Sequence, residues 1–127
     1  MRFMIMHKLD QDIPGAYSPD AAFVATMGAF VQEMVDAGVL LAGDGLRPTS
    51  KDDAARITVT NGRSTLTDGP FAETKELIAG FLMVEVRDKA EAVEWAKRYA
   101  DLFARSIGEV EIDIRRVTEM ADLEALT

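Results

Sequence analysis

Cysteine is absent from this chain of 127 residues, and histidine and tryptophan occur once each. Without cysteine there can be no disulfide, no thiolate ligand for a metal and no cysteine nucleophile. The single histidine and the scattered carboxylates show none of the spacings typical of a metal site. We therefore expect neither a metal nor any other cofactor, and the cytoplasm is the simplest location for such a protein.

Long apolar runs and an excess of positive charge are absent as well. No apolar run approaches the roughly 20 residues that cross a bilayer, and the strand-like run at residues 2–6 is too short for the core of a signal peptide. The formal net charge is -8, so a phosphate backbone or an anionic membrane would be repelled on average. We expect no direct nucleic-acid partner and no membrane partner.

The composition that remains is that of an ordinary globular domain, with 48% hydrophobic and 28% charged residues. The length suits one domain over residues 1–127 with a core of its own. Apolar runs predict strands over residues 2–8, 39–42, 56–60, 63–67, 78–86 and 110–116, and helices over about 18–37 and 89–104.

Local signals mark the ends of these elements. Ser18-Pro19-Asp20 predicts the start of the first helix, with Ser18 as the capping residue. Asp88 is the expected cap of the second helix, and Asn61-Gly62 predicts a tight hairpin turn. Inward-facing stripes are expected on both helices. They comprise Phe23, Met27, Phe30 and Met34, widened by Val24, Val31 and Val35, on the first helix, and Val93, Ala96, Ala100 and Phe103 on the second.

Without the hairpin, the order of elements is β-α-β-β-α-β, which is the ferredoxin-like α+β pattern with an antiparallel sheet. Two helices would cover one face of this sheet. The other face is also apolar, because Met4 and Met6 alternate with Phe3 and Ile5. Strands that are apolar on both sides are covered on both sides. We therefore predict a homodimer in which two sheets pack face to face.

The chain resembles the DGPF proteins of the YCII-related family in the run Asp68-Gly69-Pro70-Phe71-Ala72-Glu73-Thr74-Lys75-Glu76, followed by Gly80-Phe81. Further matches at residues 2–5, 38–46, 92–96 and 108–112 extend the likeness over essentially the whole chain. The resemblance implies a dimeric α+β barrel. It also implies a His–Asp acid/base centre, as proposed for relatives, one of which is a dehydrochlorinase of a substituted hydroquinone. Genes of the DGPF type often neighbour extracytoplasmic-function sigma factors, which suggests a regulatory association.

Asp68 and His7 are the candidate catalytic residues. Asp68 matches the acid of the family motif, and a carboxylate held at a strand end beside an inter-sheet cavity would suit proton transfer. The alternative is a turn residue that accepts backbone N–H bonds. His7, the single histidine, would be its acid/base partner. If the face of Phe3 and Ile5 packs on the helices, His7 is instead a structural residue.

Phe71, Glu73 and Lys75 are the candidate ligand-binding residues of the same segment. Phe71 would line a pocket for a small organic molecule, or would anchor its loop to the core. Glu73 and Lys75 would form a polar wall, or would be solvated charges of little energetic weight.

Two functions follow for the chain. One is a cofactor-free acid/base enzyme, of lyase or isomerase type, acting on a small organic molecule. The other is a non-catalytic ligand-binding or regulatory module. A third, a cofactor-independent monooxygenase, has only fold analogy behind it. A pocket with convergent polar groups around Asp68 would favour the enzyme, whereas an Asp68 bound to backbone amides would favour the module.

Overall fold

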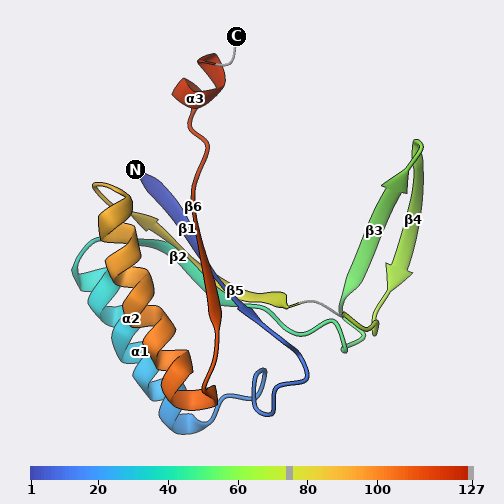
Figure 1. The fold of residues 1–127 in the computed structure, drawn as a ribbon, viewed down its shortest axis with the longest axis horizontal. Coiled ribbons are helices and arrows are strands. Elements are labelled where there is room, and N and C mark those ends of the chain that lie inside the picture. The colour runs from blue at the N-terminus through green and yellow to red at the C-terminus, as the bar shows by residue number, and fades with distance from the viewer. Residues whose placement is uncertain (74–75, 126–127) are drawn as a thin grey trace.

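The computed structural model describes residues 1–73 and 76–125 of the chain. Along the chain its elements are β1 (Arg2–Leu9), α1 (Ala21–Asp36), β2 (Leu40–Gly45), β3 (Ala55–Thr60), β4 (Arg63–Asp68), β5 (Leu77–Glu85), α2 (Lys89–Ile107), β6 (Glu111–Arg116) and α3 (Met120–Glu124) (Figure 1).

The central sheet has four strands in the order β2-β5-β1-β6, and each neighbouring pair is antiparallel. Helices α1 and α2 lie side by side over one face of it (Figure 1). This arrangement confirms the predicted ferredoxin-like α+β fold. The predicted hairpin is confirmed too: β3 and β4 pair only with each other and stand away from the central sheet (Figure 1).

The core lies between the sheet and the helices. Residues of β1 alternate in burial, so that Phe3, Ile5, His7 and Leu9 face the helices. The apolar part of this core is built by Phe3, Ile5, Phe30, Met34, Val39, Leu82, Val84, Val86, Ala92, Ala96, Tyr99 and Phe103.

The N-terminal caps of the two long helices, α1 and α2, are aspartates. The first cap is Asp20 and not the predicted Ser18, because the Asp20 carboxylate accepts the Phe23 backbone N–H at 2.8 Å. A carboxylate also complements the positive end of the helix dipole, which a serine hydroxyl does not. The predicted cap of α2 is confirmed, with Asp88 accepting from the Glu91 N–H at 2.9 Å. That helix ends at Gly108, whose φ of 85° is readily adopted by glycine.

The packed faces of the helices differ from two predictions. Val24 and Val35 are exposed, so α1 packs on one side only. On α2 the buried residues are Ala92, Ala96, Tyr99 and Phe103, so Ala96 and Phe103 were predicted correctly, whereas Ala92 and Tyr99 are buried in place of Val93 and Ala100. The shift matters because it places Tyr99 inside the molecule.

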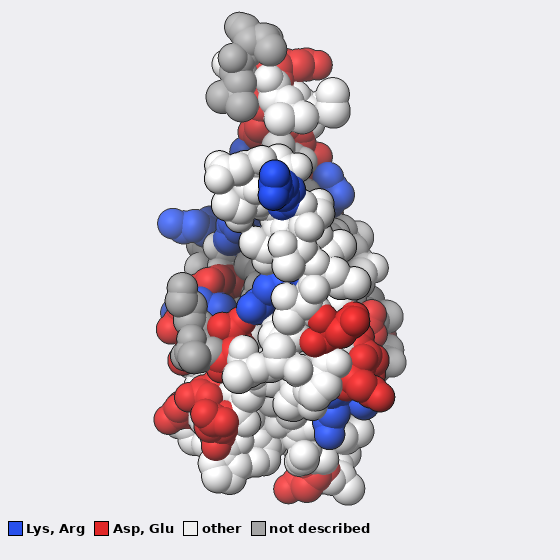
Figure 2. Space-filling view, turned by 90° about the vertical axis from the view of Figure 1, so that its right-hand side faces the viewer, with Lys and Arg blue, Asp and Glu red and all other residues white. Residues whose placement is uncertain are grey.

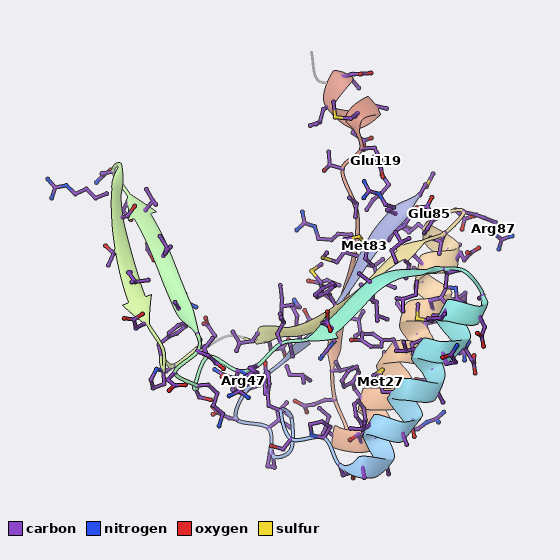
Figure 3. The ribbon with its side chains drawn as sticks, turned by 180° about the vertical axis from the view of Figure 1, so that it is seen from behind. Met27, Arg47, Met83, Glu85, Arg87 and Glu119 are labelled. Carbon is purple, nitrogen blue, oxygen red and sulfur yellow. The ribbon has the colours of Figure 1, made fainter. Side chains whose placement is uncertain are left out.

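The face of the sheet opposite the helices, here called the open face, is apolar at its centre. Met4 pairs with Met83 and Met6 with Phe81 across β1 and β5, and all four side chains are half-buried. Figure 3 shows Met83 on this side of the sheet and Met27 on the helix side. Among residues 1–73 and 76–125, no helix combines the length and the apolar character that a membrane crossing requires.

Candidate functional site

His7 is buried in the described structure, with 7% of its surface exposed. Its Nδ1 atom lies 2.5 Å from the Tyr99 hydroxyl oxygen of α2. Its ring stacks on Phe103, with the ring centres 4.3 Å apart and the planes at 27°. Strand β1 therefore carries the imidazole into an aromatic environment supplied by α2.

Gly80 makes room for this imidazole. It is the direct partner of His7 across β1 and β5. A Cβ atom at Gly80 would lie 2.4 Å from Cε1 of His7 and 2.8 Å from the Asp44 carbonyl oxygen. Because Cβ atoms do not approach other atoms so closely, any other residue at Gly80 would displace His7 or the backbone. The glycine of the Gly80-Phe81 pair in the family signature thus has a packing role here.

Burial keeps both members of the His7–Tyr99 pair neutral. Desolvation lowers the pKa of His7 from its usual 6.5 to about 4. The same effect raises the pKa of the Tyr99 hydroxyl. At neutral pH the imidazole is uncharged, so one ring nitrogen carries a proton and the other can accept a hydrogen bond. The hydrogen bond to Tyr99 orients the ring.

A cavity of about 390 Å³ lies beside His7, between the helices and the sheet. Its walls come from the loop before α1, both long helices, and strands β1, β2 and β5. Its lining residues are His7, Gly15, Ala16, Tyr17, Pro19, Phe23, Met27, Val31, Leu40, Gly43, Asp44, Gly45, Leu46, Arg47, Ala79, Phe81, Leu82, Tyr99, Phe103, Ser106 and Ile107. Most of these side chains are apolar, so the cavity suits an apolar molecule with few polar groups.

Tyr17 adds an unused polar group to this lining. Its hydroxyl is buried and has no hydrogen-bond partner among the described residues. Burial raises the pKa of this phenol, which keeps its proton and can donate it. A buried hydroxyl without a partner costs free energy.

The segment Asp68–Phe71, here called the DGPF segment, lies elsewhere, at the base of the β3–β4 hairpin. Asp68 ends β4, pairs with Ala55 and is exposed. The Gly69 N–H donates to the Ala54 carbonyl at 2.6 Å. A Cβ at Gly69 would lie 2.4 Å from the carbonyl oxygen of Lys51. The glycine therefore allows the chain to pass close to the loop before β3.

Phe71 is bound to the same loop through Thr49. The Phe71 N–H donates to the Thr49 carbonyl, and the Thr49 hydroxyl donates to the Phe71 carbonyl, both at 2.9 Å. The Arg56 guanidinium lies 4.6 Å from the centre of the half-buried Phe71 ring and donates to Glu73 at 2.5 Å. These contacts support the interpretation of Phe71 as an anchor for its loop.

The predicted site residues thus fall into two separate places. His7 lies on the helix side of the sheet, whereas Asp68 belongs to the hairpin that stands away from it (Figure 1). Within the described residues, no hydrogen bond or ion pair joins them. Phe71 and Glu73 accompany Asp68, and Lys75 lies outside the described residues.

Sequence reasoning missed Tyr99, Phe103 and Gly80 as the surroundings of His7, and Tyr17 as a cavity residue. One signal was available for the first two. Tyr99 and Phe103 are four residues apart, so they share a helix face. Nothing in the sequence placed Gly80 opposite His7, because that pairing depends on the register of two strands far apart in the chain.

Fold and cavity together define a class: a small α+β protein with a helix-covered antiparallel sheet, an inserted hairpin and a cavity beside a buried histidine. The model of the YCII-related domain matches residues 1–121, and the chain belongs to the YCII-related family. It is also similar to an uncharacterised protein of Rhizobium meliloti (strain 1021). The two are 30% identical over 99 residues, which cover 76% of this chain and 78% of that protein.

Proposed function

We propose that this YCII-related protein binds a small, uncharged and largely apolar organic molecule in the cavity beside His7. The observation that carries the proposal is a cavity of about 390 Å³ next to a buried, neutral histidine that is hydrogen-bonded to Tyr99. Ligand sites are typically apolar clefts of about 300–1,000 Å³ with a few well-placed polar groups. An apolar cavity of about 150 Å³ already holds benzene, so this one has room for a fused two-ring molecule.

The charge state of the lining determines the class of ligand. His7 is neutral at pH 7 because its pKa is about 4, and most other groups of the lining are apolar. The charged members of the lining, Asp44 and Arg47, are exposed, and Arg47 is paired with Asp53. An ionised ligand would therefore lose its hydration without gaining a buried counter-charge, which is costly.

The same pKa supports binding over acid/base catalysis. A general base works best when its pKa is near the working pH, and a histidine with a pKa of about 4 is a weak base. Asp68 does not provide a general base at the cavity in place of His7, because it is exposed on the hairpin. We therefore favour the ligand-binding module over the lyase or isomerase.

The experiment compares two fluorescent probes of similar shape, neutral 2-naphthol and anionic 2-naphthalenesulfonate. At pH 7 we expect saturable binding of 2-naphthol and at least about tenfold weaker binding of the sulfonate, which is 1.4 kcal/mol. Met27→Trp fills the cavity and should abolish 2-naphthol binding. Val24→Trp changes an exposed residue of the same helix and should leave binding unchanged. Equal binding by both tryptophan variants, or tighter binding of the sulfonate, would contradict the proposal.

We also propose that the protein is a homodimer with the two open faces packed together. The support is the half-buried apolar centre of that face, at Met4, Met6, Phe81 and Met83. Charged residues border it on β6, where Asp113 and Arg115 lie opposite Met6 and Met4. An apolar centre with a polar rim is the usual anatomy of a protein interface. Sedimentation equilibrium should give twice the 13.9 kDa mass of one chain, and Met83→Asp should give the single mass.

A further inference from the structure

The β3–β4 hairpin presents an apolar face that stays exposed among residues 1–73 and 76–125. Ile57, Val59 and Leu66 are 71%, 64% and 60% exposed. The register pairs Ile57 with Leu66, and alternation places Val59 on that same face. Thr58 and Thr65 pair on the opposite face. An isolated hairpin is at best marginally stable in water, so this one would gain stability from a surface that covered its apolar side.

The total exposed surface of the chain is larger than that expected of a compact monomer of the same mass. The chain exposes 8444 Å². A compact monomer of 13.9 kDa exposes roughly 6,700 Å² by the scaling of surface with mass, so this chain exposes about a quarter more. The surplus is larger than the roughly 800 Å² that each partner contributes to an interface of standard size.

The hairpin and the open face share one side of the molecule. Figure 3 shows the hairpin standing on the side of the sheet away from the helices, which is the side of Met83. Figure 2, viewed from the hairpin side, shows a largely uncharged strip with acidic groups on either side of its lower part. A molecule seated on the open face would therefore lie beside the hairpin.

Charge favours a second copy of this chain as that molecule. The β3–β4 hairpin carries Arg56 and Arg63 against one acidic residue, Asp68 at its base, whereas the whole chain has a net charge of -8. Arg56 is paired with Glu73 of its own chain, so Arg63 beside the hairpin turn is the group that an acidic body, such as another copy of the chain, would attract. In a two-fold dimer the hairpin of each copy would contact the same surface of the other copy.

We propose that β3–β4 is a dimerisation arm, which lays Ile57, Val59 and Leu66 against the second copy of the chain. The DGPF segment is the anchor of this arm. Its Gly69–Ala54 and Phe71–Thr49 hydrogen bonds hold both ends of the hairpin against one loop and so set the direction in which the arm leaves the sheet. The inference rests on the proposed homodimer and is independent of the ligand cavity.

The test measures dimer dissociation by sedimentation equilibrium in two matched double variants. Ile57→Asn with Leu66→Asn removes the apolar face of the arm, and Thr58→Asn with Thr65→Asn makes an equal change on the other face. The first should raise the dimer dissociation constant at least about tenfold, and the second should change it less than about twofold. Hydrogen exchange should show β3 and β4 amides protected in the wild-type dimer and exposed in the first variant.

The outcomes separate the arm from the dimer. A wild-type dimer that responds equally to both double variants would overturn the arm and leave the dimer standing. A wild-type chain that is monomeric at all concentrations would overturn both. If Met83→Asp stays dimeric while the Ile57 and Leu66 variant dissociates, the arm stands and the packing of open faces is overturned.

Discussion

His7 and Asp68 were candidates for one acid/base pair, yet their surroundings are opposite. His7 lies in an aromatic core, with Tyr99 hydrogen-bonded to Nδ1 and Phe103 stacked on its ring. Asp68 is exposed at the end of a hairpin strand. The two residues therefore do not form one site: His7 lines the cavity, whereas Asp68 belongs to a segment whose loop contacts are made by Gly69 and Phe71.

The first prediction tests the close packing around His7 and has the largest expected effect. Gly80→Val should lower the free energy of unfolding by about 3 kcal/mol or more, because overpacking a tight site forces side chains and backbone to move. Gly80→Ala should be milder, and combining it with His7→Ala should restore part of the loss. Chemical denaturation measures all three, and an additive double variant would show that Gly80 and His7 do not compete for space.

The second prediction concerns the pH dependence of stability. The pKa of His7 is about 4 in the folded chain and about 6.5 in the unfolded chain. Between pH 4 and pH 6.5 His7 therefore binds a proton in the unfolded chain but not in the folded chain. The stabilisation by neutral His7 is complete above pH 6.5 and is lost as the pH falls toward 4. The shift corresponds to about 3 kcal/mol.

Carboxylates titrate in the same pH range, so the measurement compares wild type with His7→Gln. Unfolding free energies of both should be determined from pH 7 to pH 4, and the wild type should lose about 3 kcal/mol more. Parallel pH profiles would mean that His7 does not titrate with a depressed pKa.

The third prediction concerns the other side of the comparison, the anchor of the hairpin. Phe71→Ala removes a half-buried ring that contacts Arg56 and should lower stability by about 2 kcal/mol. It should also increase hydrogen exchange in β3 and β4, with no effect on 2-naphthol binding. A loss of 2-naphthol binding in Phe71→Ala would contradict this prediction and show that the DGPF segment contributes to the ligand site.

The fourth prediction has the smallest expected effect. Asp68→Asn changes an exposed side chain, so stability should change by less than about 0.5 kcal/mol. Binding of 2-naphthol should stay at the wild-type level. A tenfold change in affinity would show that the Asp68 charge acts on the ligand after all.

Much of the architecture could be predicted because its signals are local. Asn61-Gly62 requires positive φ at both turn residues, and the structure has φ of 52° and 78° there. The β-α-β-β-α-β order leaves few ways to bury the apolar faces, and the ferredoxin-like sheet is one of them. The errors are local as well: Asp20 and not Ser18 caps α1, and two of the four buried positions of α2 lie one residue before the predicted ones.

The candidate site was harder to predict because it depends on contacts between distant parts of the chain. Alternation along β1 correctly placed His7 with Phe3 and Ile5 on the buried face. Its partner Tyr99 lies 92 residues further on and is buried in place of Ala100, which was predicted to face inward. The partnership of Asp68 with His7 was inferred from the family signature, which carries no information about distance.

The sequence alone therefore determined the elements, the hairpin turn, the fold class and the family, because propensity, periodicity, turn chemistry and motif matching act over a few residues at a time. The tertiary structure decided that His7 is neutral, that Gly80 makes room for it, and that the cavity lies on the helix side. Those properties come from desolvation and close packing, which exist only when β1, β5 and α2 are brought together.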